Sequence, residues 1–219
     1  MKRNHFLERA VWGCLAIVIA GIVVAVLIQE RPSLLSRRAL VGGDSERLPV
    51  IKPLGDFVLT NQVAQPVTLA GLAGEPFVAN IFFTRCPSIC VQMTHKMKEL
   101  QDALPPESSL RLLSITTDPD YDQPEILSRY GKRFGADAER WSFLTGDPSE
   151  IARVIQKELL LAVRENPEAE RQSELDLFTH SSLIVLVDAQ GRLRNTYESM
   201  GTNTLQTLLQ DLNRLESSN

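Results

Sequence analysis

The hydrophobic and polar positions of this chain follow two different periods. From Leu54 onward, short blocks that are continuously apolar or alternate in polarity take turns with longer blocks whose apolar residues recur every three to four positions. The first pattern is typical of strands and the second of amphipathic helices. The predicted strands are 56–60, 66–72, 77–84, 110–118, 141–146, 181–188 and 192–198, and the predicted helices are 86–104, 125–135, 147–161 and 203–216.

The order of these elements predicts an α/β domain. Residues 77–84 form an unbroken apolar, β-branched and aromatic run, as expected for a strand buried on both faces. The alternation of strands and helices predicts a mainly parallel sheet that helices cover on both sides. Two hairpins add to it: one turns at residues 61–65, and the other joins the last two strands. Residues 164–178 are polar and acidic, and we expect an exposed insertion there.

A different pattern precedes the domain. Residues 11–28 are eighteen consecutive residues without a charge. At about 1.5 Å per residue, such a helix nearly spans a hydrocarbon core of about 30 Å. The run is longer than the apolar region of a typical cleaved signal peptide, and no small-residue cleavage site follows it. We therefore expect a short cytoplasmic N-terminus at 1–10, an uncleaved transmembrane anchor at 11–28, a linker at 29–48 and the folded domain at 49–219.

Charge limits the partners and the location of the chain. Residues 49–219 carry 16 Lys and Arg against 23 Asp and Glu, a formal charge of −7. An acidic domain argues against nucleic acid as a partner. Basic residues are nearly balanced on the two sides of the apolar run, so only the short leading segment favours a cytoplasmic N-terminus. That segment contains Glu8 and is unlike a mitochondrial transit peptide, which favours a bacterial inner membrane.

Candidate chemistry is concentrated in "FFTRCPSIC", residues 82–90. Cys86 and Cys90 stand where a predicted strand gives way to a helix, whereas Cys14 lies in the apolar run. Ligands commonly bind at this edge of an open α/β sheet. If both cysteines are helical, their Cβ atoms are about 5 to 6 Å apart, wider than a relaxed disulfide requires. The spacing mildly favours a shared metal, while a helix N-terminus that lowers the pKa of Cys86 keeps redox chemistry open.

A site with two sulfurs needs a further ligand, and the chain has three histidines. His5 precedes the apolar run and should lie across the membrane, and the helical period turns His95 away from the cysteines. His180 precedes strand 181–188 and can approach the cysteines if that strand neighbours strand 77–84. The alternative for His180 is a strand-end histidine that binds no ligand. Two Cys and one His would suit Cu(I), Cu(II) or Zn(II).

Four further residues near this segment have simpler roles to weigh. Met93 and Met97 have helical spacing, which favours core packing over metal binding. Asp118 ends strand 110–118, and Asp122 follows four residues later. They can stand beside the candidate site, or they can have a structural role in a turn and at a helix N-cap.

The order of these motifs resembles the Sco/SenC family, membrane-tethered thioredoxin-like copper chaperones that help to metallate the dinuclear copper site of cytochrome c oxidase. The likeness covers about residues 49–217. "FFTRCPSIC" looks like the family's Phe-Thr-x-Cys-Pro-x-x-Cys stretch, and "SITTDPDYDQPEIL" is similar to its Asp-Pro-x-x-Asp-x-Pro stretch. "WSFLTG" is similar to its Leu-Thr-Gly strand, and "HSSLIVLVDAQGRL" to its His-Ser strand and turn.

The resemblance implies a thioredoxin-like fold with an N-terminal β-hairpin, preceded by one transmembrane helix. It also implies that Cys86, Cys90 and His180 bind copper, that Asp118 and Asp122 stand beside the site, and that the domain faces the periplasm. The chain departs from the family pattern at two positions, which are Val91 in place of Pro and Thr179 in place of Asp. The second departure leaves open what orients the imidazole of His180.

Three functions are compatible with these residues. The first is a copper chaperone that delivers copper to the copper-site subunit of cytochrome c oxidase or to another copper carrier, rather than an enzyme. The second is a thiol-disulfide oxidoreductase that reduces partner cysteines. Against it stand the Cys-x-x-x-Cys spacing and the lack of a proline before strand 181–188. The third is a peroxidase, but Thr84 is only two residues before Cys86, closer than in the peroxiredoxin motif.

Overall fold

The computed structural model describes residue 12 and residues 47–171 and 177–217. Residues 47–219 belong to one compact unit. Within the described residues, no helix is both long and apolar enough to cross a membrane. The predicted anchor at 11–28 lies outside the described residues except for Trp12, and the predicted linker lies outside them except for its last two residues.

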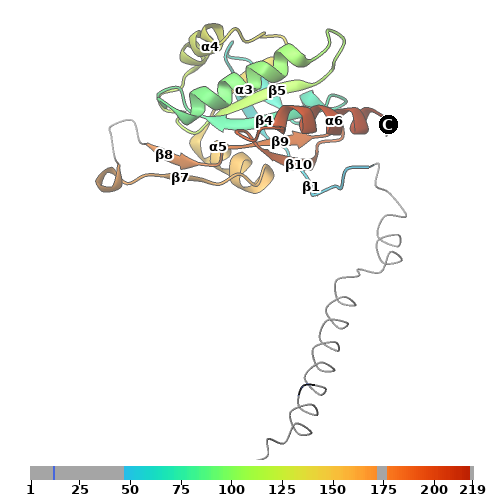
Figure 1. Ribbon diagram of the computed structural model, residues 1–219. Helices are drawn as coiled ribbons and strands as arrows, with labels where there is room; N and C mark the ends of the chain where they lie inside the picture. Colours follow the sequence, from blue (N-terminus) through green and yellow to red (C-terminus); the bar gives the residue numbers. More distant parts are fainter. Residues whose placement is uncertain (1–11, 13–46, 172–176, 218–219) are drawn as a thin grey trace, which may run out of the picture. The chain divides into compact units, whose positions relative to one another are not determined.

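A mixed eight-stranded sheet forms the centre of the domain (Figure 1). The strands lie in the order β1-β10-β9-β4-β5-β6-β2-β3. Their bounds are β1 (Lys52–Pro53), β2 (Val58–Asn61), β3 (Pro66–Thr68), β4 (Phe77–Phe82), β5 (Arg111–Thr116), β6 (Trp141–Thr145), β9 (Leu183–Val187) and β10 (Arg192–Glu198). A separate two-stranded sheet pairs β7 (Val163–Glu165) with β8 (Phe178–His180).

The directions of the strands correct one prediction. Only β4, β5 and β6 run parallel to one another, while the other pairings of the large sheet are antiparallel. The expected mainly parallel sheet is therefore wrong. The reason is that β9 is apolar and buried almost throughout, so its pattern looks like that of a parallel strand although it runs antiparallel to β4. Both predicted hairpins, β2–β3 and β9–β10, are confirmed.

Helices follow the strands much as their periods predict. The bounds are α3 (Ile89–Ala103), α4 (Pro124–Arg133), α5 (Pro148–Arg153), the π-helical turn η2 (Val154–Glu158) and α6 (Thr204–Ser217), with short 3-10 turns at η1 (Ala70–Leu72) and η3 (Glu168–Glu170). Asp147 caps α5 as predicted, because its carboxylate accepts the N–H groups of Ser149 and Glu150. The predicted helix 147–161 thus ends in a π turn rather than continuing as an α-helix.

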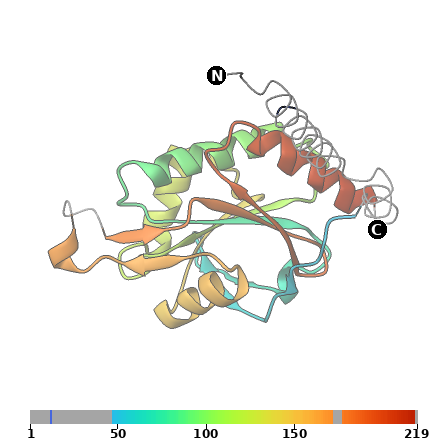
Figure 2. The same cartoon turned by 60° about the horizontal axis from the view of Figure 1, so that its bottom comes forward.

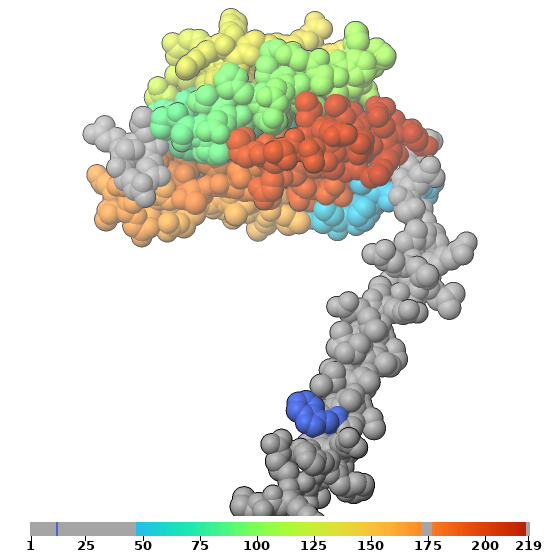
Figure 3. Space-filling model, viewed as in Figure 1, coloured from blue at the N-terminus to red at the C-terminus, as the bar shows by residue number. Residues whose placement is uncertain are grey.

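Helices cover both faces of the sheet. Figures 1 and 2 show α3 and α6 on one face and α5 on the other, and Figure 3 shows α3 in green beside α6 in red. The strand β4 is fully buried, with Val78 and Phe82 in the core under α3 and α6. Phe77 and Ile81 point into the other core, under α5. Burial of side chains this large contributes about 1.5–3 kcal/mol each, so β4 anchors both layers.

The strand order brings three chain segments to one edge of the sheet. Phe82, the last residue of β4, lies beside Thr116 at the end of the parallel strand β5. Because β9 runs antiparallel to β4, the start of β9 also lies at this edge. The cysteine segment, the loop after β5 and the segment that precedes β9 therefore meet there. This was the condition under which His180 could approach the cysteines.

Candidate functional site

The cysteine segment is a turn followed by a helix, which corrects the predicted helix start. Helix α3 begins at Ile89, and Ser88 is its N-cap residue. Cys86 and Pro87 lie in the preceding loop, where the N–H of Cys86 donates to the carbonyl of Phe83 at 3.2 Å. The Cβ separation expected of two helical residues four apart therefore does not apply to this pair. Helical spacing therefore gives no reason to prefer a shared metal over a disulfide for these two cysteines.

Two buried carboxylates hold this loop in place. Asp122 is fully buried and accepts hydrogen bonds from the backbone N–H of Thr84, at 3.0 Å, and from the hydroxyls of Thr84 and Thr116. Asp118, which is 6% exposed, accepts hydrogen bonds from Nε and Nη2 of Arg85 at 2.9 and 2.6 Å. Both carboxylates thus bind residues just before Cys86. Burial raises the pKa of Asp122, while the hydrogen bonds from Thr116 and Thr84 oppose that rise.

The three predicted ligands are brought together. Cys86 and Cys90 are buried free thiols, and Sγ of Cys90 lies 3.1 Å from Nε2 of His180. The pKa of Cys86 responds to both Cys90 and His180, so its thiol belongs to the same cluster. Among the described residues, no group of three or more His, Cys, Asp or Glu side chains is already arranged to hold a metal ion. Their contacts are those of a metal-free cluster, and metal binding by these residues stays a prediction.

His180 is the last residue of β8, not the first of the β9 segment. The expected exposed insertion at 164–178 thus includes the last two residues of β7, the 3-10 turn η3 and the first residue of β8, and β7 and β8 pair as a short hairpin. Nδ1 of His180 lies 3.0 Å from the carbonyl of Ser181 and donates to it, because a carbonyl can only accept. This hydrogen bond leaves Nε2 as the ring nitrogen that faces Cys90. The backbone therefore supplies the orientation that no carboxylate at position 179 provides.

The pKa values of the two thiols are shifted in opposite directions. A hydrogen bond from the side chain of Cys90 is the main cause that lowers the pKa of Cys86, and His180 adds to it while burial opposes it. The interaction with Cys86 and burial raise the pKa of Cys90. The metal-free pair therefore shares one negative charge, with the thiolate at Cys86. The lowered pKa of Cys86 agrees with the prediction, but its cause is the neighbouring thiol rather than a helix N-terminus.

A chain of two buried hydrogen bonds, here called the hydroxyl relay, connects Tyr130 through Thr94 to the backbone of Cys90. The hydroxyl of Thr94 donates to the carbonyl of Cys90 at 2.8 Å and accepts from the hydroxyl of Tyr130 at 2.9 Å. Burial raises the pKa of Tyr130, so it stays protonated as the donor. Met93 and Met97 are fully buried core residues and His95 is exposed, as predicted. The relay was not predicted, although Thr94, four residues after Cys90 on the same helix, was a detectable signal.

Comparison with known proteins places this arrangement. The domain belongs to the α/β thioredoxin-like class, as its likeness to solved structures shows. The family model described as SCO1/SenC matches residues 49–216. The chain belongs to that family.

Relatives share most of the domain. A protein from Bacillus subtilis (strain 168) described as "SCO1 protein homolog" is 30% identical over 173 residues, which cover 78% of this chain and 86% of the relative. The structure of BsSco, described as a member of the Sco family of cytochrome c oxidase assembly proteins with a disulfide switch, matches with a TM-score of 0.68 and 28% identity, covering 79% of this chain and 99% of that one. The structure of Bradyrhizobium japonicum ScoI, solved with copper bound, matches with a TM-score of 0.63 and 27% identity, and the match covers 74% of this chain and 99% of that one.

Proposed function

We propose that this chain is a copper chaperone that binds Cu(I) or Cu(II) through Cys86, Cys90 and His180 and delivers it to the dinuclear copper site of cytochrome c oxidase. The observation that carries the proposal is the 3.1 Å approach of Nε2 of His180 to the sulfur of Cys90, in a cluster that also influences the pKa of Cys86. Thiolate and imidazole are ligands that copper prefers. The copper in the structure of a relative 27% identical to this chain supports the same role here.

The chemistry of the site suits a cargo that must be released. Copper binding displaces the proton of Cys90, because a thiolate is the ligand form, and uses the free lone pair of His180. The hydrogen bond of Nδ1 to Ser181 keeps the imidazole aimed while Nε2 is exchanged. A thiolate from the recipient can then replace one ligand at a time, so that the metal is never left without soft donors.

The location of the protein is part of the proposal. Residues 11–28 would anchor the chain in a bacterial inner membrane, residues 1–10 would face the cytoplasm, and residues 29–48 would tether the domain at 49–219 in the periplasm. The uncharged length of residues 11–28 supports an anchor. A protease-protection experiment on spheroplasts tests this: the domain should be degraded when protease is added outside, and its survival would contradict the orientation.

Copper titration of the full chain in detergent tests the ligand set. In a Cys14→Ser background, which leaves only Cys86 and Cys90 as thiols, one equivalent of copper should bind. His180→Ala should weaken Cu(II) binding at least tenfold, on the order of the loss expected for a ligand. His95→Ala is the matched control, since His95 is exposed on α3 and should leave affinity unchanged. Equal affinities of the His180→Ala and wild-type chains would refute the three-ligand site.

Thiol-disulfide exchange is the second candidate, and the low pKa of Cys86 favours it. The thiolate of Cys86 would attack a partner disulfide and form a mixed disulfide, releasing one partner thiol. Cys90 would then form a bond with Cys86 and release the second thiol, so two electrons pass to the partner and a dithiol reductant must restore the pair. Rapid reduction of a protein disulfide by a chain that binds copper only weakly would favour this reading over the first.

A further inference from the structure

The face of the β7–β8 hairpin that carries His180 also lines a cavity. In the hairpin register, Val163 lies opposite His180 and Glu165 lies opposite Phe178. Directly opposed residues share a face of an antiparallel pair, and so do residues two apart along a strand. One face of the hairpin therefore presents His180 to Cys90 and, directly beside it, Phe178, Val163 and Glu165 to the cavity.

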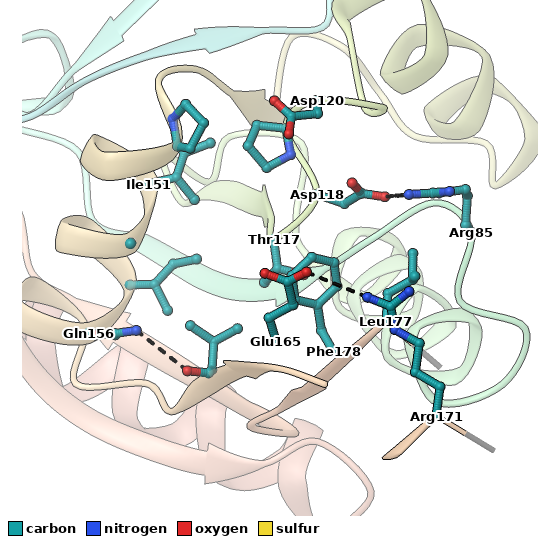
Figure 4. Close-up of a pocket in the computed structure, with 15 residues that line it drawn as sticks. Arg85, Thr117, Asp118, Asp120, Ile151, Gln156, Glu165, Arg171, Leu177 and Phe178 are labelled. Atoms are coloured by element: carbon teal, nitrogen blue, oxygen red, sulfur yellow. Dashed lines mark hydrogen bonds and ion pairs between the residues drawn. The ribbon is translucent and has the colours of Figure 1, made fainter. Parts of the chain in front are cut away.

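This cavity, here called the α5–β7 pocket, is bounded by α5 and η2, by residues 117–120 after β5, and by the hairpin (Figure 4). Its volume is about 560 Å³, within the range of about 300–1,000 Å³ of binding pockets. Its inner wall includes Ile151, Ile155 and Phe178. Arg85, which directly precedes Cys86 in the chain, also lines the pocket. The pocket therefore adjoins the cysteine loop.

Charged residues surround this apolar wall, and their pairing leaves the pocket mouth negative. Arg85 is paired with Asp118 at 2.6 Å, and Arg171 with Glu165 at 3.5 Å, so each pair is neutral overall. The remaining acidic residue of the lining is Asp120, which is exposed. Figure 4 shows Asp120 on the loop above the cavity, on the side of Ile151. An occupant that fits would combine an apolar group with a positive charge.

The backbone of β7 favours an extended peptide over a small molecule. Within the described residues, β7 pairs only with β8, through hydrogen bonds at Ala162 and Asn166. In an antiparallel pair only every second residue directs its backbone N–H and C=O groups to the partner strand. Because Ala162 and Asn166 bond to the β8 side, Val163 and Glu165 direct their backbone groups away from β8. The amide of Gln156 reaches the carbonyl of Val163 only at 3.4 Å. An extended segment can add to such an edge and insert alternate side chains into the neighbouring pocket.

We infer that the α5–β7 pocket docks an extended segment of the copper recipient, with an apolar side chain against Ile155 and Phe178 and a Lys or Arg beside Asp120. This inference rests on the proposed function and adds the surface by which the recipient is held. Docking there places the recipient next to Cys86 and His180, which converts copper transfer into an exchange between ligands already in proximity. The same pocket would be unnecessary for binding the metal itself.

Copper transfer kinetics test the inference, with the purified metal-free copper-site domain of cytochrome c oxidase as the probe. Ala152→Trp fills the pocket from α5, and Asp120→Lys reverses the charge at its mouth. Ala138→Trp and Glu107→Lys, at exposed positions outside the lining, are the matched controls. All four variants should bind copper as the wild-type full chain does, because none touches Cys86, Cys90 or His180.

We expect Ala152→Trp to lower the second-order transfer rate constant about tenfold, since steric block of an interface centre commonly removes most of its binding energy. Asp120→Lys should lower it about fivefold at low ionic strength, and the difference should shrink in 0.5 M salt as charges are screened. Transfer at the wild-type rate by both pocket variants would overturn the inference and leave the proposed function standing. A wild-type chain that binds copper but neither binds nor loads the domain would overturn both.

Discussion

The two sides of the candidate site are built very differently. The loop that carries Cys86 is attached to the large sheet by two buried carboxylates, Asp118 and Asp122, which together accept five hydrogen bonds from Thr84, Arg85 and Thr116. His180 instead ends a hairpin whose short strands pair with each other and not with the large sheet. The sulfur side is therefore tied to the large sheet by hydrogen bonds, while the imidazole side belongs to a separate small sheet that meets the cysteine segment through ring contacts of Phe83 with Phe178 and His180.

This difference suits an exchange reaction. Elements with few core contacts open at lower free energy than the core does. A histidine on a separate hairpin can therefore leave a shared ligand site without breaking the hydrogen bonds that Asp118 and Asp122 make to the cysteine loop. We interpret the cysteines as the fixed half of the site and His180 as the half that can open. The following predictions test that division, from the largest expected effect to the smallest.

Removal of the buried carboxylate of Asp122 should lower stability more than any other change to the fixed half of the site. Asp122→Ala leaves the donors of Thr84 and Thr116 buried without their acceptor, which should lower the free energy of unfolding by about 3 kcal/mol. Urea unfolding of the full chain in detergent, followed by near-ultraviolet circular dichroism, measures this. The exposed neighbour is the control, and Asp120→Ala should change stability by less than about 0.5 kcal/mol. A loss below about 1 kcal/mol for Asp122→Ala would show that the loop does not depend on it.

Alkylation tests the charge shared by the two thiols. In the wild type, Cys86 should stay reactive toward iodoacetamide at pH 6, because its pKa lies well below the ordinary thiol value of about 8.5. Cys90→Ala removes the main cause, so the pKa of Cys86 should rise toward the ordinary value and its rate at pH 6 should fall at least about tenfold. Peptide mass spectrometry separates Cys86 from Cys14. Cys90→Ser, which keeps a donor, should retain part of the reactivity, and identical pH profiles for the wild-type and Cys90→Ala chains would contradict the shared charge.

Backbone strain at the entry to the hairpin offers a stabilising change. Leu160 has a φ of 56°, in the left-handed region that glycine adopts without steric cost, and its side chain is 52% exposed. Leu160→Gly should raise the free energy of unfolding by about 0.5–1 kcal/mol. Ala64→Gly, at a φ of 59° in the β2–β3 turn, should stabilise the large sheet in the same sense. A destabilised Leu160→Gly chain beside a stabilised Ala64→Gly chain would mean that the Leu160 side chain supports the hairpin.

The smallest effect should come from loosening the hairpin alone. The hydroxyl of Thr179 donates to the side-chain oxygen of Asn166 at 2.8 Å, and Thr179→Val removes this bond. Its loss should leave urea unfolding almost unchanged but speed copper release to a Cu(I) chelator about threefold, as a bond worth about 1 kcal/mol within the hairpin allows. Thr196→Val, at an exposed position of β10, is the control. An unchanged release rate would argue that the hairpin does not gate the imidazole.

The sequence predicted the central elements because their signals are local. The apolar run of β4 and the cap at Asp147 each depend on neighbouring residues, and both are confirmed. Strand direction was missed because a buried strand is apolar whichever way it runs, as β9 shows. The residue pattern left open whether His180 reaches the cysteines, and the resemblance to the Sco/SenC family implied that it does; the strand order brings His180 to Cys90.

The start of α3 was missed for a different reason. Pro87 is a good first-turn residue, so the local pattern favoured a helix from Cys86. The loop instead follows hydrogen bonds from Thr84 and Arg85 to carboxylates more than thirty positions away. Such tertiary contacts override local preference and leave no periodic signal. The β7–β8 hairpin was missed because each strand has only three residues, too few to show a period.

The hydrogen bond from Nδ1 of His180 to the carbonyl of Ser181 has a consequence for how this chain can vary. A side-chain acceptor can be lost by one substitution, but every amino acid at position 181 carries the same carbonyl oxygen. The aim of the imidazole is thus insulated from a change of side chain at position 181. Redesign of this imidazole through its hydrogen-bond partner would accordingly require a change of backbone path rather than of residue type.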